Sequence, residues 1–121
     1  MLRQLLFAKI HRATVTGADV NYIGSITLDP NLIQAAGLVE WERVQVVDVT
    51  NGARLETYVI PGTPGQGEVQ LNGAAAHLIH KGDTVIIMAY AYLTAGEIAE
   101  HQPTVVFVDE ANRITEIKKS L

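Results

Sequence analysis

Cysteine is absent from the 121 residues of this chain. The chain therefore has no disulfide framework, no thiolate nucleophile and no cysteine-based metal site. Charged residues make up only 18% of the sequence, below the roughly 25% that is usual for a soluble domain. This shortage of charge suggests that part of the surface is buried in an oligomer.

Two further absences exclude classes of partner. The nine Lys and Arg residues are scattered and the formal net charge is -4, whereas nucleic-acid binding needs clustered positive charge. The longest apolar stretch, 85–93, is far shorter than the roughly 18 residues of a membrane span. Arg3 and Lys9 also interrupt the segment where a signal peptide would have its apolar core. We therefore expect a cytoplasmic protein with no nucleic-acid and no membrane partner.

The pattern of apolar residues predicts a mainly β fold in a single domain, 1–121. Short runs that alternate or are rich in β-branched residues are typical of strands. They occur at 13–16, 44–50, 69–71, 84–92 and 104–108. Regular strand–helix alternation is missing, which favours a small β-barrel with short helices over a doubly wound parallel sheet.

Capping signals predict three short helices, at 29–37, at 72–82 and after residue 94. The segment 61–67, PGTPGQG, is rich in proline and glycine. It is neither a dinucleotide-binding nor a P-loop motif, and we expect a flexible surface turn there.

Asn51-Gly52 joins two strand-like runs, and this dipeptide is a strong signal for a β-hairpin. On the strand that follows, alternation places Arg54 and Tyr58 on one face and Thr57 on the other. Arg54 fits a carboxylate through two parallel hydrogen bonds, and Tyr58 can give or take a proton. The pair suits an acidic substrate, although an ordinary solvated strand face more often explains such a pair.

The histidines permit a metal interpretation, since His77 and His80 lie three residues apart with Asp83 close behind. A catalytic zinc site usually has three protein ligands, and without cysteine the third would have to be another histidine or a carboxylate. Surface or helix-capping roles fit these residues better. We expect no metal site.

Gly24 lies directly before Ser25 within a strand-like run, 22–29. Glycine weakens a strand and leaves nothing to pack, so it marks either a β-bulge or a peptide bond that is built to break. With no Cβ, Gly24 also leaves its carbonyl open to attack by the Ser25 hydroxyl.

Four strings of the sequence carry a shared pattern of order and spacing: KIHRATVT (9–16), YIGS (22–25), TNGARLETY (50–58) and NGAAAH (72–77). In this order and spacing they resemble the aspartate 1-decarboxylase family. The resemblance runs from Leu2 to about Asp109, and it departs from the family pattern at 61–67. The tail after Asp109 carries no motif.

The resemblance implies a double-psi β-barrel and a homotetramer with active sites between subunits. It also implies a precursor that cuts itself between Gly24 and Ser25 into a β chain, 1–24, and an α chain, 25–121. Ser25 would become a pyruvoyl group, the covalent cofactor that forms a Schiff base with L-aspartate. The implied reaction yields β-alanine and CO2 and supplies pantothenate and coenzyme A biosynthesis.

The resemblance also assigns roles to individual residues. Thr57 and Tyr58 are both assigned to one site although alternation separates them, which a site between subunits or a bulge would explain. His11 is a further candidate, to hold the new carboxylate at Gly24, although an ordinary strand histidine is the simpler interpretation. The assigned groups are Ser25 and Tyr58 for catalysis; Gly24, Ser25, Thr57 and Asn72 for self-processing; and Lys9, Arg54, Thr57, Gly73, Ala74 and Ala75 for substrate binding.

Two other functions stay open at this point. After the same acyl shift, hydrolysis of the ester would leave Ser25 as the N-terminal nucleophile of an amidohydrolase. Small double-psi barrels also serve as non-enzymatic binding modules, and a fold alone does not fix function.

Overall fold

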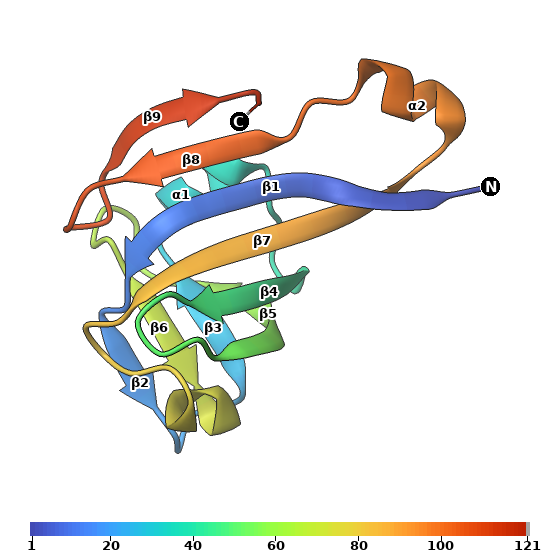
Figure 1. Ribbon diagram of the computed structural model, residues 1–121. Coiled ribbons are helices and arrows are strands. Elements are labelled where there is room, and N and C mark those ends of the chain that lie inside the picture. The colour runs from blue at the N-terminus through green and yellow to red at the C-terminus, as the bar shows by residue number, and fades with distance from the viewer. Residues whose placement is uncertain (121) are drawn as a thin grey trace.

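The computed structural model describes residues 1–120 of the chain. Within these residues nine strands form one mixed sheet in the order β2-β6-β3-β5-β4-β7-β1-β8-β9 (Figure 1). The strands are β1 (Arg3–Thr14), β2 (Gly17–Asp19), β3 (Ser25–Leu28), β4 (Arg43–Asp48), β5 (Arg54–Pro61), β6 (Val69–Asn72), β7 (Thr84–Leu93), β8 (Thr104–Val108) and β9 (Ile114–Lys118).

Two regions of the sheet are easily distinguished in Figure 1. β1 and β7 pair antiparallel along most of their length and form a long ribbon that reaches toward the N-terminus. At the other end of the molecule, β3 lies between β6, which is antiparallel to it, and β5, which is parallel to it. The mainly β fold with short helices is confirmed, and the sheet is consistent with a small β-barrel.

The core lies on the inward face of the strands. Along β7 buried and partly exposed residues alternate, and Val85, Ile87 and Ala89 are almost completely buried. Ile10 of β1 pairs with Ile87, and Val46 of β4 pairs with it from the other side. Full burial of such a side chain contributes about 1.5–3 kcal/mol, so this alternation fixes which face of the sheet is inside.

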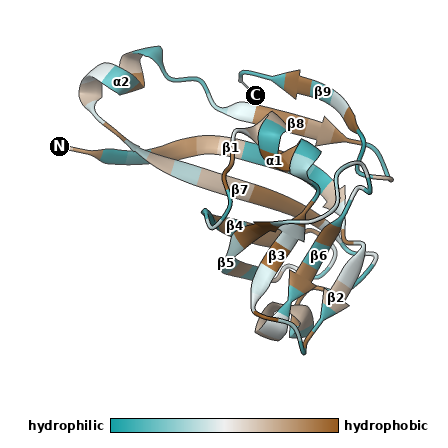
Figure 2. Ribbon diagram, turned by 180° about the vertical axis from the view of Figure 1, so that it is seen from behind, coloured by the Kyte–Doolittle hydropathy of each residue, from teal (hydrophilic) through white to brown (hydrophobic). Residues whose placement is uncertain are grey.

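Short helices connect the strands, and Figure 2 shows α1 lying across β8 and β1. Asp29 caps α1 by accepting a hydrogen bond from the Asn31 backbone N–H (2.8 Å), and Gly37 ends the helix with a left-handed φ of 74°. Thr94 and Glu97 form the capping box of α2. These two predicted caps are confirmed, whereas the cap predicted at residue 72 makes no side-chain capping hydrogen bond. The helices are α1 (Pro30–Ala36), the 3-10 helix η1 (Gly73–His77) and α2 (Ala95–Glu100). No helix within 1–120 is long and apolar enough to cross a membrane.

Two predicted elements differ clearly in extent from the structure. Of the strand predicted at 13–16, only residues 13 and 14 lie in a strand, and they are the end of β1, which begins at Arg3. The helix predicted over 72–82 is only the five-residue η1, and β9 was not predicted because its residues are all exposed and carry no burial pattern. The β4–β5 hairpin is confirmed. Gly52 in its turn has a φ of 80°, and the Asp48 carboxylate accepts hydrogen bonds from the Thr50 and Asn51 N–H groups.

Candidate active site

The Gly24–Ser25 peptide bond lies where a surface turn meets a buried strand. Gly24 is exposed in a bend, whereas Ser25 is the first residue of β3 and is only 1% exposed. The interpretation of Gly24 as a bulge inside a strand is therefore wrong, because the strand begins after it. A Cβ built on Gly24 would meet no other atom within 4 Å, so the side of the glycine where a side chain would stand is open.

The Ser25 hydroxyl is held from two directions. It donates a hydrogen bond to the Ile23 carbonyl oxygen (2.9 Å) and accepts one from Asn72 Nδ2 (2.9 Å). Asn72 is fully buried and stands directly opposite Ser25 in the antiparallel β3–β6 pair. The pairing of these two strands thus brings together two residues that are 47 positions apart.

The Asn72 side-chain amide uses all of its hydrogen-bonding groups. Its Nδ2 also donates to Thr27 Oγ1 (2.9 Å), and its Oδ1 accepts from Gln70 Nε2 (2.9 Å). The four side chains Ser25, Thr27, Gln70 and Asn72 therefore form one polar cluster within the β3–β6 pair, called here the Asn72 cluster.

Gly73 brings backbone directly against the Gly24–Ser25 bond. Its φ is 72°, and a Cβ there would stand 2.7 Å from Gly24 Cα. Both the left-handed conformation and this close approach require glycine. Gly73 opens η1, so Ala74 and Ala75 continue from the same place.

Thr57 and Tyr58 approach the same bond from β5. Ile26 pairs with Val59 in the parallel β3–β5 pair, and continuing that register places Tyr58 level with Ser25 and Thr57 level with Gly24. The two side chains point to opposite faces, as alternation predicts. Within residues 1–120 no hydrogen bond joins Thr57 to Gly24.

Tyr58 has an aromatic neighbour that the sequence did not indicate. Its ring packs against Trp41, with ring centroids 5.9 Å apart and an interplanar angle of 34°. Trp41 is 67% exposed, so the two rings form an open aromatic surface rather than part of the core.

Lys9 is not brought near Ser25 within one chain. Lys9 pairs with Met88, Met88 with Gln45, and Gln45 with Glu56. These three strand spacings of about 4.8 Å separate Lys9 from β5 by about 14 Å along the sheet, and β3 lies one strand further.

His11 lies in the same distant part of the sheet. It pairs with Phe107 of β8, and the two rings meet edge to face with centroids 5.5 Å apart. Burial lowers the pKa of His11, and the positive charges of Lys9 and Arg12 lower it further. The structure therefore does not place His11 beside Gly24 of its own chain.

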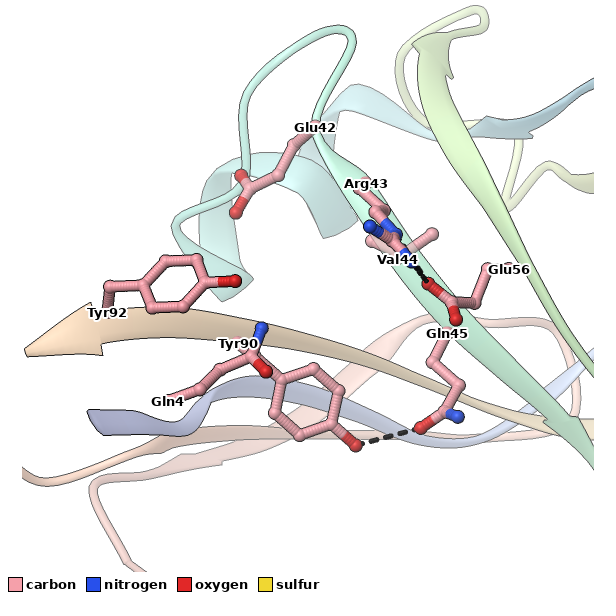
Figure 3. A pocket seen from close by; sticks show the side chains of 8 residues that line it. All are labelled: Gln4, Glu42, Arg43, Val44, Gln45, Glu56, Tyr90 and Tyr92. Carbon is pink, nitrogen blue, oxygen red and sulfur yellow. Dashed lines mark hydrogen bonds and ion pairs between the residues drawn. The ribbon is translucent and has the colours of Figure 1, made fainter. Parts of the chain in front are cut away.

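A hollow on the surface lies away from the Gly24–Ser25 bond. It has a volume of about 540 Å³ and covers the outer face of β4, β7 and the start of β1 (Figure 3). Arg43 forms an ion pair with Glu56 on one side of it, and the Tyr90 hydroxyl donates to Gln45 Oε1 (2.9 Å) on another. None of the residues assigned to catalysis, processing or substrate binding lines this hollow.

The histidine pair has local partners. His80 Nε2 lies 3.1 Å from the His77 carbonyl oxygen, and His80 Nδ1 lies 3.8 Å from the Asp83 carboxylate. In the described part of the chain, 1–120, no three His, Cys, Asp or Glu side chains are grouped in a way that would hold a metal ion.

The sequence was also compared with known proteins. The model of the aspartate decarboxylase family matches residues 1–115. The chain belongs to the aspartate decarboxylase family.

Three curated relatives agree with this family assignment, and all three are named aspartate 1-decarboxylase. The protein of Corynebacterium efficiens is 60% identical over 94% of this chain and 84% of its own length. Those of Caldicellulosiruptor saccharolyticus and Clostridium beijerinckii are each 56% identical over 97% of this chain, and the matches cover 91% and 94% of their lengths.

The residues of this family member assigned from sequence divide into two groups. Gly24, Ser25, Asn72 and Gly73 are in contact, and Thr57 and Tyr58 are level with them on β5. Arg54 is exposed at the start of β5, and Lys9 lies on a distant strand.

Sequence reasoning missed Gln70, although period-2 alternation from Asn72 along β6 places both on one face.

Proposed function

We propose that this chain decarboxylates L-aspartate to β-alanine and CO2, after cutting itself between Gly24 and Ser25, and so supplies pantothenate and coenzyme A biosynthesis. Membership of the family supports the reaction. The observation that carries the self-cutting step is the buried Ser25 hydroxyl, oriented by Asn72 and Ile23 next to an exposed, sterically open Gly24.

The proposed cut uses only groups of the chain and water. Ser25 Oγ attacks the Gly24 carbonyl carbon, the amide C–N bond breaks, and an ester forms beside a free Ser25 amine. Loss of the Ser25 Cα proton then breaks the Cβ–Oγ bond and leaves a carboxylate on Gly24. Water hydrolyses the resulting dehydroalanine to a pyruvoyl group and ammonia.

The surroundings of the bond suit this sequence of steps. Asn72 Nδ2 donates to Oγ, which is the atom that becomes a carboxylate oxygen when the Cβ–Oγ bond breaks. Thr57, level with Gly24, is assigned as the donor to the Gly24 carbonyl oxygen. One well-placed donor at a developing oxyanion is worth about 3–4 kcal/mol, or about two to three powers of ten in rate.

The side of Gly24 where a side chain would stand is open, which leaves space on that side for the severed end when a pyruvoyl group forms at position 25. A pyruvoyl group at this position would supply an acceptor for the electron pair that remains when CO2 leaves the substrate. Tyr58 is level with this position and is assigned to donate a proton to the substrate carbon. Trp41 packs against the Tyr58 ring and limits its orientations.

Substrate binding is assigned to a positive group and to backbone. The exposed Arg54 guanidinium is suited to a substrate carboxylate, and the backbone of Gly73, Ala74 and Ala75 lines the site. A dianionic substrate approaching a chain of net charge -4 needs such local positive charge.

A single domain, 1–121, in a homotetramer is part of the proposal. The distance of Lys9 from β3 within one chain supports a site between subunits, with Lys9 supplied by the neighbour. The exposed apolar side chains of Tyr22, Ile23 and Trp41 near the site also favour coverage by another subunit. A cytoplasmic location stays a prediction.

Intact-protein mass spectrometry and CO2 release test the proposal together. Wild-type protein is expected to give fragments 1–24 and 25–121, the larger one lacking its N-terminal amine and reacting with a carbonyl reagent, and to release CO2 from L-aspartate. Ser25→Ala should stay intact and inactive. A larger fragment that keeps a free amine would support the amidohydrolase instead, and an intact wild-type chain without CO2 release would support a binding module.

A further inference from the structure

Gln70 is a polar residue whose side chain faces the centre of the Asn72 cluster. It lies on β6 two positions before Asn72, is half-buried, and donates from Nε2 to Asn72 Oδ1 at 2.9 Å. This donor is outside the set of residues assigned to the reaction.

The Gln70 bond determines which way the Asn72 amide points. A side-chain amide has one accepting oxygen and one donating nitrogen, and the two ends occupy nearly the same space. With Oδ1 toward Gln70 Nε2, both hydrogens of Nδ2 are directed to Ser25 Oγ and Thr27 Oγ1. Rotating the amide by half a turn would bring two NH2 groups together and present a carbonyl oxygen to Ser25.

Gly17 has no side chain, and the Gln70 side chain occupies the space where one would stand. The two residues pair in the parallel β2–β6 contact. A Cβ at Gly17 would stand 2.8 Å from Gln70 Oε1 and 3.4 Å from its amide carbon. The position of the Gln70 amide therefore depends on a glycine in the neighbouring strand.

We propose that Gln70 is a positioning residue for cleavage of the Gly24–Ser25 bond, acting by holding the Asn72 amide with its NH2 group toward Ser25 Oγ. The inference rests on the proposed self-processing. Oγ gains negative charge as the Cβ–Oγ bond breaks, so a donor at this atom favours the step and a carbonyl oxygen opposes it.

The test follows cleavage in protein made by cell-free translation, in which synthesis is stopped and the uncut chain and its two fragments are measured over time. Gln70→Ala removes the donor and is expected to slow cleavage about tenfold, as the loss of one orienting hydrogen bond implies. Gln70→Glu replaces the donor with an acceptor of the same size, which favours the rotated Asn72 amide, and should slow cleavage further.

Thr16→Val is the matched control for a purely structural effect. Thr16 Oγ1 donates to the Val69 carbonyl oxygen (3.1 Å) and accepts from the Val69 N–H (3.0 Å). These bonds belong to the same β2–β6 edge but do not touch Asn72. The control should lower the melting temperature about as much as Gln70→Ala and leave the rate of cleavage unchanged.

A double-mutant cycle with Gly17→Ala tests whether the position of the Gln70 amide affects the rate of cleavage. Gly17→Ala pushes against the Gln70 amide and should slow cleavage in the wild-type background. It should have no effect on the cleavage rate when Gln70 is already alanine, because the group that it displaces is gone. A general weakening of β2 would instead slow cleavage equally in both backgrounds.

The inference is overturned if Gln70→Ala and Gln70→Glu cleave at the wild-type rate, if Thr16→Val slows cleavage as much as they do, or if the Gly17→Ala effect is the same in both backgrounds. Each of these outcomes requires that the wild-type chain cuts itself, so the proposed function would survive. A wild-type chain that never cuts overturns the proposed function and this inference together.

Discussion

Asn72 and Asn112 are both buried and both use every hydrogen-bonding group of their amides, but they bind different partners. Asn112 Oδ1 accepts from the Thr14 N–H, and its Nδ2 donates to the carbonyl oxygens of Thr14 and Gly67, each at 2.8 Å. Asn72 binds only side chains, the Ser25 and Thr27 hydroxyls and the Gln70 amide.

The difference separates a structural role from a chemical one. Backbone partners are present whatever the neighbouring residue is, so Asn112 joins the end of β1, the 61–67 loop and the turn before β9 into one unit. Side-chain partners exist only because particular residue types occur there, and Asn72 orients a hydroxyl beside a bond that the chain is proposed to cut. Both side chains are buried and hydrogen-bonded through both ends of the amide, so their partners, and not their burial, indicate the two roles.

Asn72→Ala should have the largest effect on the chemical side of this comparison. It removes the donor to Ser25 Oγ, and loss of one such donor typically costs about 100- to 1000-fold in rate. Formation of the 1–24 and 25–121 fragments, followed by intact mass after synthesis, measures this. Asn112→Ala serves as the control, and an equal slowing by both variants would remove the distinction.

Asn112→Ala should have the larger effect on stability. It leaves one N–H and two carbonyl groups without their partner, and each unsatisfied buried group costs about 1–3 kcal/mol. We expect the free energy of unfolding to fall by about 3 kcal/mol, measured by urea denaturation of the uncleavable Ser25→Ala chain. Because Asn112 has a φ of 62°, Asn112→Gly is the companion variant that removes the amide without straining the backbone. A loss below 1 kcal/mol in both would contradict the structural role.

The two asparagines also show what a sequence reveals. The caps of α1 and α2 and the alternation along β5 were predicted because each depends on residues close together in the chain. The contact between Asn112 and Thr14 spans 98 positions and has no local signal. Asn72 was assigned a role only through the family resemblance, and Gln70 was missed although the same strand carries both.

The boundaries of β1 were missed for a related reason. Its first half is exposed or half-buried, so its apolar pattern is weak, and it becomes a strand through pairing with β7. The same long ribbon carries Lys9 away from Ser25. The family resemblance assigned both residues to one site, but the sequence does not say which subunit supplies each of them.

Arg54→Ala should have an intermediate effect, because Arg54 is assigned to substrate binding and not to the hydrogen bonds of Asn72 or Asn112. Its exposed guanidinium is assigned to a substrate carboxylate, so KM for L-aspartate should rise about tenfold, the worth of one charge-assisted contact, while fragment formation is unchanged. Arg43→Gln is the matched control, since Arg43 lies on the same face of the next strand but is paired with Glu56. Unaltered KM in Arg54→Ala, or an equal rise in Arg43→Gln, would refute the assignment.

Asp29 extends the comparison to a charged group with backbone partners only. Its Oδ1 accepts from the N–H groups of Asn31 and Gly65, and its Oδ2 accepts from that of Gly67 (2.8 Å). Burial acts to raise the pKa of Asp29, but these hydrogen bonds outweigh it and hold the pKa below its ordinary value. The carboxylate should therefore stabilise the fold, as Asn112 does, without taking part in cleavage.

Asp29→Asn should have the smallest effect, and the effect should depend on pH. A lowered pKa in the folded state means that the stabilisation is fully present above the ordinary aspartate pKa and is lost as the pH falls through the lowered value. At pH 7 the variant should be less stable by about 1 kcal/mol, because Gly67 N–H loses its acceptor. Melting temperatures of the two proteins should then converge as the pH falls below about 4. If the melting temperatures of the two proteins instead differ by the same amount from neutral to acid pH, the Asp29 charge contributes nothing to the stability of the fold. The structural role assigned to Asp29 by comparison with Asn112 would then be wrong.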